Sequence, residues 1–167
     1  MATDTFHRAV VGFGANLGDR EHTANTALQL IEKRIGEILL ASPLFENPAL
    51  IPANDPVGTQ PSFLNAVWIV KTILSAEACL NELIEIEHQF GRVRTYRWGA
   101  RIIDLDLIAY DSLIYESQRL VVPHPEMFKR DFVLIPMCQV WPEWRHPILG
   151  RTATELLQEI ENSPPKS

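Results

Sequence analysis

The chain has 167 residues, of which 46% are hydrophobic and 22% are charged, and its formal net charge is -6. This length and composition suit one folded domain with a sizeable core, and four Trp and seven Phe are atypical of a disordered chain. The negative charge argues against nucleic acid as a partner, so any anion-binding site must be local. We therefore expect a single domain over residues 1–167, with a frayed tail at about 162–167.

The N-terminal residues 1–7 lack the basic start and the apolar stretch of a signal peptide, and no apolar run approaches the roughly 20 residues that cross a membrane. Cys79 and Cys138 lie far apart in apolar segments, which is typical of reduced, buried thiols rather than of a disulfide or a zinc site. The sequence thus predicts a cytoplasmic protein with no membrane partner. We expect a monomer, with a homodimer as the alternative.

The first part of the chain alternates between strand and helix patterns. A β-branched, apolar segment at 8–13 predicts a strand, 14–19 predicts a turn-rich loop, and apolar residues at helical spacing predict a helix over 20–35. A second strand is expected at 37–45. The Pro-rich stretch at 46–62 is long for a small domain, which indicates a disordered or functional loop.

A strand at 63–72, a helix at 75–90 and a strand at 102–110 complete a β-α-β-β-α-β order. This order is the split arrangement of ferredoxin-like α+β folds, in which helices pack on an antiparallel sheet. The remaining expected elements are a hairpin, a short segment and a C-terminal helix, at 111–122, near Met127 and at 152–160.

Two aspartates, Asp104 and Asp106, interrupt the otherwise apolar strand at 102–110. Side chains at this spacing share one face of a strand, with Cα atoms roughly 6–7 Å apart, whereas Leu105 and Leu107 point to the other face and into the core. Aspartate is depleted in strands and like charges repel, so a divalent cation such as Mg²⁺ would explain the pair. The motif alone leaves an alternative, a wet polar face or salt bridges to nearby arginines.

Four arginines lie just upstream of this pair, at Arg92, Arg94, Arg97 and Arg101. Guanidinium groups bind phosphate oxygens bidentately, and a cationic loop beside a two-carboxylate metal site is what phosphoryl transfer requires. A solvated basic loop that pairs with surface acids is the alternative. The glycines at 12–18 lack the spacing of a nucleotide-binding loop, so we interpret that segment as a tight turn into the first helix.

Several segments match the motifs of one family in the same order. They are G-A-N-L-G-D at 14–19, F-L-N-A-V at 63–67, E-H-Q-F-G-R-V-R-T-Y-R-W-G-A-R-I-I-D-L-D-L at 87–107, L-V-V-P-H-P at 120–125 and R-D-F-V-L-I-P-M at 130–137. The chain resembles the 6-hydroxymethyl-7,8-dihydropterin pyrophosphokinases of folate biosynthesis. The resemblance implies a ferredoxin-like domain that transfers pyrophosphate from ATP to the pterin's hydroxymethyl group, depends on Mg²⁺ and releases AMP.

The resemblance also implies roles for single residues. The expected catalytic residues are Asp104 and Asp106, as ligands of two Mg²⁺ ions, and Arg92 and Arg101, which would hold the phosphates. The expected pterin contacts are Phe63, Asn65, Trp98, Arg130 and Phe132. The expected ATP contacts are Arg92 and Arg101 again, with Glu87, Leu107, Arg119 and His124. Phe63 and Phe132, both of which we place on apolar strands, would sandwich the flat pterin, and the Asn65 amide would read its edge.

One segment departs from the family, which usually carries Thr-x-Pro before the Phe-Leu-Asn strand. Either Asn47-Pro48 or Asn54-Asp55-Pro56 takes that place here, and the sequence does not choose between them. It does not identify a general base either. Two other functions stay open, a different Mg²⁺-dependent nucleotidyl or phosphoryl transferase and a non-catalytic ferredoxin-like module that binds a ligand or RNA.

Overall fold

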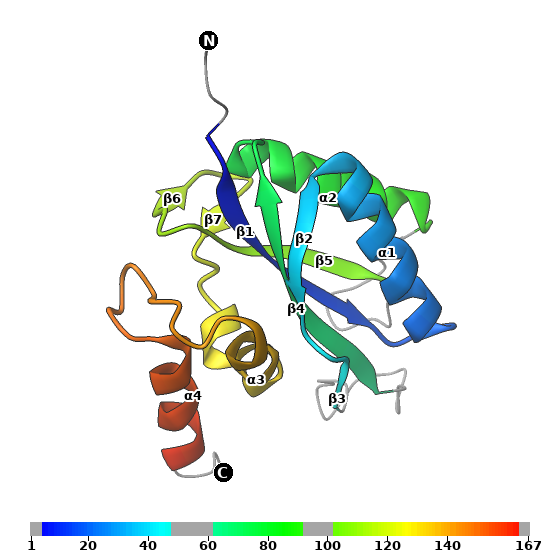
Figure 1. Ribbon diagram of the computed structural model, residues 1–167. Helices are drawn as coiled ribbons and strands as arrows, with labels where there is room; N and C mark the ends of the chain where they lie inside the picture. Colours follow the sequence, from blue (N-terminus) through cyan, green and yellow to red (C-terminus); the bar gives the residue numbers. More distant parts are fainter. Residues whose placement is uncertain (1–4, 48–61, 92–101, 164–167) are drawn as a thin grey trace.

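An antiparallel sheet forms the middle of the protein, and the computed structural model describes residues 5–47, 62–91 and 102–163 (Figure 1). The strands are β1 (His7–Ala15), β2 (Gly36–Ala41), β3 (Phe45–Asn47), β4 (Phe63–Thr72) and β5 (Asp104–Tyr110). Their spatial order is β2-β4-β1-β5, and β3 pairs with the other end of β4. Every one of these pairings is antiparallel, so β1 is the central strand that joins β4 to β5.

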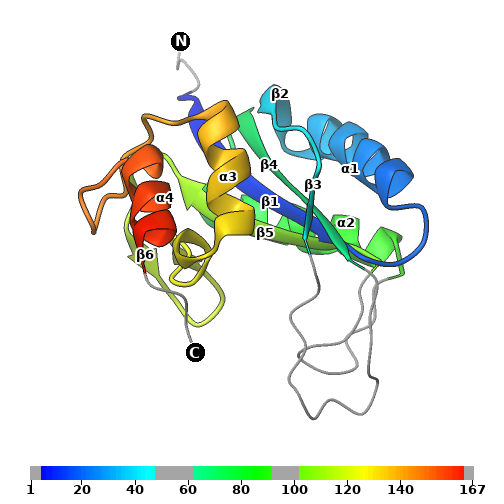
Figure 2. The ribbon, with the colours of Figure 1, turned by 90° about the horizontal axis from the view of Figure 1, so that it is seen from below.

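Helices cover both faces of this sheet (Figure 2). On one face lie α1 (Arg20–Arg34) and α2 (Ala76–Gln89), and on the other lie the 3-10 turn η1 (Met127–Lys129), α3 (Asp131–Val140) and α4 (Ala153–Asn162). A small hairpin of β6 (Tyr115–Glu116) and β7 (Val121–Val122) connects β5 to η1. Two apolar cores result, one on each face of the sheet, because side chains alternate between faces along each strand.

The helix starts follow from capping residues in the sequence. The Asp19 side chain accepts a hydrogen bond from the N–H of His22 at the start of α1, and Ser75 does the same for α2. Gly36 opens β2 where a Cβ atom would lie 1.9 Å from the carbonyl oxygen of Lys71, so only glycine fits this close approach. In the described residues no helix is long and apolar enough to cross a membrane.

The expected ferredoxin-like α+β fold is confirmed, with two local differences among the early elements. The expected strand at 37–45 is broken into β2 and β3 around Pro43, where a proline cannot donate to the ladder. Ser42 keeps this break attached to β4, since its Oγ accepts a hydrogen bond from the Val67 N–H at 2.9 Å. Gly14 belongs to β1 rather than to the expected loop.

The sequence reading missed a helix. Residues 131–140 form α3, so the placement of Phe132 on a strand is wrong. The segment is β-branched and contains Pro136, both of which favour a strand or a break over a helix. Its apolar side chains nevertheless recur at helical spacing and pack on β4, on the sheet face opposite α1 and α2. This packing outweighs the local preference against a helix. The C-terminal helix α4 forms as expected and extends to Asn162.

Candidate active site

The candidate site lies on the sheet face that also carries α3, where three strands place chemically distinct residues side by side. Asn65 on β4 pairs with Gly14 on β1, and Gly14 pairs in turn with Asp104 on β5. Cross-strand partners share a face, and neighbouring strands are about 4.8 Å apart, so the Asn65 and Asp104 backbones are roughly 10 Å apart. Glycine puts no side chain between them. Asp106 pairs with Gly12 in the next row along β5.

Asp104 and Asp106 are half-buried, whereas Leu105 between them is only 5% exposed and belongs to the core under α1 and α2. The expectation that both carboxylates share a face opposite the leucines is therefore confirmed. Beside Leu105, the buried carboxylate of Glu87 at the end of α2 accepts a hydrogen bond from the Leu105 N–H at 2.8 Å. The sequence reading assigned Glu87 to ATP, and this backbone contact is a role it did not foresee.

Asn65 is 8% exposed, and its Nδ2 donates a hydrogen bond to Oδ1 of Asn47 on β3. Its own Oδ1 lies over Gly14, 3.2 Å from the position that a Cβ atom there would take, and Phe63 lies close to the same position. Asn47 pairs directly with Phe63, so β3 holds this asparagine beside the expected pterin residues. Asn54, the other candidate for the family's threonine, lies outside the described residues.

His124 and Arg130 reach the site from the segment between β7 and α3. Burial lowers the pKa of His124 below its ordinary value and the positive charge of Arg130 lowers it further, while the charges of Glu126 and Asp104 act in the opposite direction. His124 therefore lies within electrostatic reach of both Arg130 and Asp104. The Arg130 guanidinium also lies 5.7 Å from the centre of the Phe132 ring, at the start of α3.

Two expected ATP contacts have other surroundings in this structure. Arg119 forms an ion pair with Glu77 and donates to Asn81, both in the first half of α2. Glu77 and Glu87 are ten positions apart in α2, about 15 Å along a helix, so Arg119 lies far along α2 from the carboxylate pair. The Leu107 side chain is 3% exposed and faces the core, which leaves only its backbone for a nucleotide.

The remaining expected site residues, Arg92, Trp98 and Arg101, lie outside the described residues. Within the described part of the chain, no three His, Cys, Asp or Glu side chains lie close enough to hold a metal ion together. The donor set that the sheet does offer, two adjacent carboxylates, fits Mg²⁺, which takes one or two protein carboxylates and fills its other positions with water and phosphate oxygens. Asp104 and Asp106 thus fit a metal that arrives together with a phosphate ligand.

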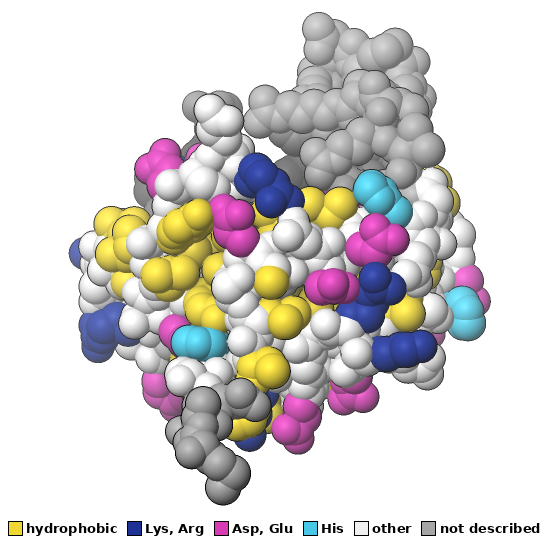
Figure 3. Space-filling view, turned by 90° about the horizontal axis from the view of Figure 1, so that it is seen from above, with side chains coloured by type: hydrophobic (Ala, Val, Ile, Leu, Met, Phe, Trp, Pro, Cys, Tyr) yellow, Lys and Arg dark blue, Asp and Glu magenta, His cyan; other side chains and the backbone are white. Residues whose placement is uncertain are grey.

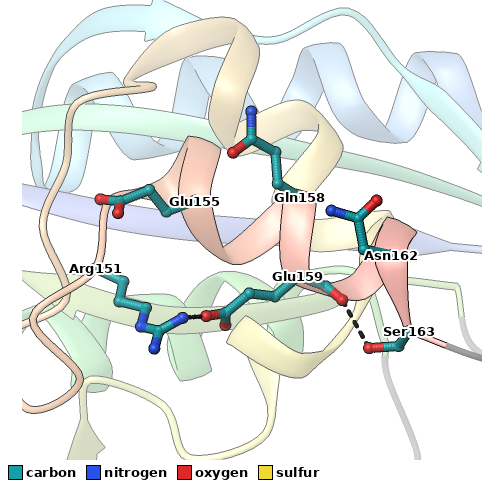
Figure 4. A pocket seen from close by; sticks show the side chains of 6 residues that line it. All are labelled: Arg151, Glu155, Gln158, Glu159, Asn162 and Ser163. Atoms are coloured by element: carbon teal, nitrogen blue, oxygen red, sulfur yellow. Dashed lines mark hydrogen bonds and ion pairs between the residues drawn. The ribbon is translucent and has the colours of Figure 1, made fainter.

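A hollow at the C-terminal end of the chain has no part in this arrangement (Figure 4). Its lining residues all come from the α4 region and are exposed or nearly so: Arg151, Glu155, Gln158, Glu159, Asn162 and Ser163. An ion pair joins Arg151 to Glu159 across it. On the face drawn in Figure 3, acidic and basic side chains of the described residues are interspersed, which offers no broad basic surface to nucleic acid.

The sequence reading overlooked the glycines of β1. Gly12 and Gly14 alternate with core residues along the strand and lie opposite Asp106 and Asp104. A glycine inside a strand often marks a place where a ligand approaches closely, so the G-x-G spacing within an apolar strand was the available signal. The sequence analysis instead interprets these glycines as part of a tight turn, whereas the structure places both in β1.

This fold and site define an α+β protein of the ferredoxin-like class with two adjacent carboxylates on one strand of its sheet. The family model described as 7,8-dihydro-6-hydroxymethylpterin-pyrophosphokinase (HPPK) matches residues 10–142. A 2-amino-4-hydroxy-6-hydroxymethyldihydropteridine pyrophosphokinase from Synechocystis is 35% identical over 93% of this chain and 77% of its own length. The enzyme of the same name from Pseudomonas aeruginosa is 38% identical, over 90% of each chain.

The chain therefore belongs to the HPPK family, and the expected family and enzyme class are confirmed. A solved structure of Plasmodium falciparum HPPK-DHPS with pteroate superposes with a TM-score of 0.74 at 17% identity. The alignment covers 95% of this chain and 45% of that longer one, so the chain spans less than half of that protein. At this identity the likeness supports the fold alone.

Proposed function

We propose that this chain transfers pyrophosphate from ATP to the hydroxymethyl group of 6-hydroxymethyl-7,8-dihydropterin in folate biosynthesis, with release of AMP. The observation that carries this proposal is the row Asn65–Gly14–Asp104 across three adjacent strands. It sets an amide that can pair with a pterin edge about two strand spacings, roughly 10 Å, from a carboxylate suited to a metal. The pterin would lie across Gly14 with its hydroxymethyl end toward the carboxylates.

In the proposed reaction, the pterin hydroxyl oxygen attacks the β-phosphorus of ATP in line. A new oxygen–phosphorus bond forms as the bond from that phosphorus to the α-phosphate oxygen breaks, and AMP leaves. The hydroxyl proton passes to water or to an aspartate. Mg²⁺, when held by Asp104 and Asp106 as two ions, would neutralise charge on the triphosphate.

The other groups on this face would bind and orient the substrates. Phe63 and Phe132 offer rings to the two faces of the pterin, and Arg130 lies beside Phe132 as a positive charge for the phosphates. A lowered pKa keeps His124 uncharged near neutral pH, so it can accept or donate a hydrogen bond to the nucleotide. Arg92 and Arg101 are proposed to hold the phosphates, as the family resemblance implies.

We also propose that the protein is a cytoplasmic monomer and that its substrates are small molecules. Free Cys79 and Cys138 support a reducing compartment. Light scattering on a sizing column would test the oligomeric state, and a mass twice that of one chain would contradict the monomer.

Chromatography of the products formed from ATP, Mg²⁺ and the pterin tests the function. We expect AMP and pterin pyrophosphate in equal amounts, lost in Asp104→Asn and retained in Glu161→Gln, a change on the exposed surface of α4. ADP in place of AMP would indicate a different phosphoryl transferase. RNA binding without any turnover would instead indicate the non-catalytic module.

A further inference from the structure

Strand β5, which carries both site aspartates, lies at an edge of the sheet. It pairs with β1 on one side and ends the strand order on the other, within the described residues. An edge strand has backbone N–H groups without a ladder partner. At Leu105 the Glu87 carboxylate supplies the acceptor that a neighbouring strand would otherwise provide, since its Oε2 accepts a hydrogen bond from the Leu105 N–H at 2.8 Å.

This contact is well defined because both partners are buried. Glu87 is 7% exposed and Leu105 is 5% exposed, although charged side chains are rarely buried without a partner. The side chain of Leu105 packs in the core under α2, so Leu105 is fixed through both its side chain and its backbone. Asp104 and Asp106 are its immediate neighbours, and their spacing and direction depend on how Leu105 is held.

The Glu87 carboxylate is directed to the backbone of β5 at Leu105. It contacts the backbone from the side of α2, whereas Asp104 and Asp106 face the α3 layer. Among the residues that the structure describes, no cluster of three candidate ligands includes it. Any influence of this contact on the two aspartates therefore passes through the backbone of the strand.

We propose that Glu87 is a positioning residue, which holds the β5 backbone between the two aspartates and so sets their carboxylates for the metal. This inference rests on the proposed function, since it assumes that Asp104 and Asp106 bind the metal with the nucleotide. Groups that orient metal ligands typically change metal affinity by about 10- to 100-fold when they are lost. The role requires an acceptor oxygen at the right reach and does not require its negative charge.

Two substitutions separate reach from charge. Glu87→Gln keeps an oxygen at the same distance along the side chain and removes the charge, whereas Glu87→Asp keeps the charge and is one methylene shorter. Mn²⁺ binding in the presence of a non-hydrolysable ATP analogue, followed by electron paramagnetic resonance, reports the metal site without turnover. We expect Mn²⁺ affinity within about threefold of the parent for Glu87→Gln and about 10- to 100-fold weaker for Glu87→Asp.

Hydrogen exchange at the Leu105 amide gives a second readout that needs neither metal nor turnover. Exchange should be faster in Glu87→Asp and unchanged in Glu87→Gln, because only the aspartate loses the contact. Glu85→Gln and Glu85→Asp are the matched controls, since Glu85 is exposed on the same helix. Both controls should match the parent in Mn²⁺ affinity.

Three results would overturn the proposal. If Glu87→Gln loses as much Mn²⁺ affinity as Glu87→Asp, the negative charge of Glu87 carries the role. If Glu87→Asp binds Mn²⁺ as tightly as the parent does, Glu87 does not position the aspartates. If either variant binds ATP more weakly while its Mn²⁺ affinity is unchanged, Glu87 is a nucleotide contact. A parent protein that makes no AMP but shows the expected Mn²⁺ pattern would reject the proposed reaction and keep this inference. A parent protein that makes AMP, with Mn²⁺ affinity unchanged in both variants, would keep the proposed reaction and reject this inference.

Discussion

Replacing Gly14 with alanine tests whether the pterin lies over the central strand. The added Cβ atom would meet Asn65 Oδ1 at 3.2 Å and a ring carbon of Phe63 at 3.8 Å. The first contact is tighter than usual, so the Asn65 amide must move by a few tenths of an ångström, while the second is ordinary packing. The perturbation therefore falls on the side chain that is proposed to read the pterin.

The two consequences of this substitution differ in size. A glycine-to-alanine change that the backbone accepts stabilises a protein by about 0.4–1 kcal/mol, which offsets the tight contact, so we expect unfolding free energy within about 1 kcal/mol of the parent. A disturbed hydrogen bond costs about 0.5–1.5 kcal/mol, which corresponds to pterin binding that is roughly 2- to 13-fold weaker. Titration calorimetry with a pterin, in the presence of a non-hydrolysable ATP analogue and Mg²⁺, measures this loss.

Gly12→Ala is the matched control, two residues away on the same face. Its Cβ atom would lie 2.7 Å from Cδ1 of Ile108, which is fully buried, so this change overfills the core. We expect Gly12→Ala to cost about 1–3 kcal/mol of stability, with pterin binding by the folded protein nearly unchanged. If Gly14→Ala instead bound the pterin as tightly as the parent does, the placement of the pterin over β1 would be wrong.

Three further predictions follow from contacts described above. If Asn47 rather than Asn54 takes the place of the family's threonine, Asn47→Leu should weaken pterin binding several-fold, because it removes the acceptor for the Asn65 amide. Asn47→Asp, which keeps the acceptor, and Asn54→Ala should bind the pterin normally, and equal losses in Asn47→Leu and Asn54→Ala would contradict this hypothesis. Burial lowers the pKa of His146, whose Nδ1 accepts two backbone N–H groups, so the stability it contributes is present above about pH 6.5 and is lost as the pH falls through its folded pKa. The unfolding free energy measured with urea should fall less between pH 7.5 and pH 5.5 in His146→Ala than in the parent. An equal fall in both proteins would show that His146 is not the cause of the pH dependence. Gly36→Ala places a Cβ atom 1.9 Å from the backbone oxygen of Lys71, so we expect a marked drop in melting temperature. A melting temperature equal to that of the parent would contradict this close approach of the two strands.

The sequence predicted most where local pattern and tertiary context agree. The strand at 63–72 has the bounds of β4, because its residues other than Asn65 and Lys71 are β-branched or apolar and the structure buries nearly all of them. Helix α3 was missed because Pro136 and β-branched neighbours oppose a helix locally, and only packing against β4 favours it. Local propensity carries no information about that packing surface.

The candidate site shows the same division. The pairing of Asp104 and Asp106 on one face follows from the two-residue repeat of a strand, which needs no knowledge of the fold. The contact from Glu87 to Leu105 could not be predicted, because it depends on β5 being an edge strand with that particular N–H turned outward. The place of Gly14 likewise depends on the register of β1 against both of its neighbours.

Strand β1 is hydrogen-bonded along both sides, and its side chains enter both apolar cores. Segments of this kind exchange their amide hydrogens only when the whole molecule opens. The amides of Gly12 and Gly14 should therefore report global unfolding, even though they lie beneath the proposed substrates. A bound pterin at free concentration L would then slow the exchange of these amides by the free energy with which it stabilises the folded state, RT ln(1 + L/Kd), rather than by covering them locally.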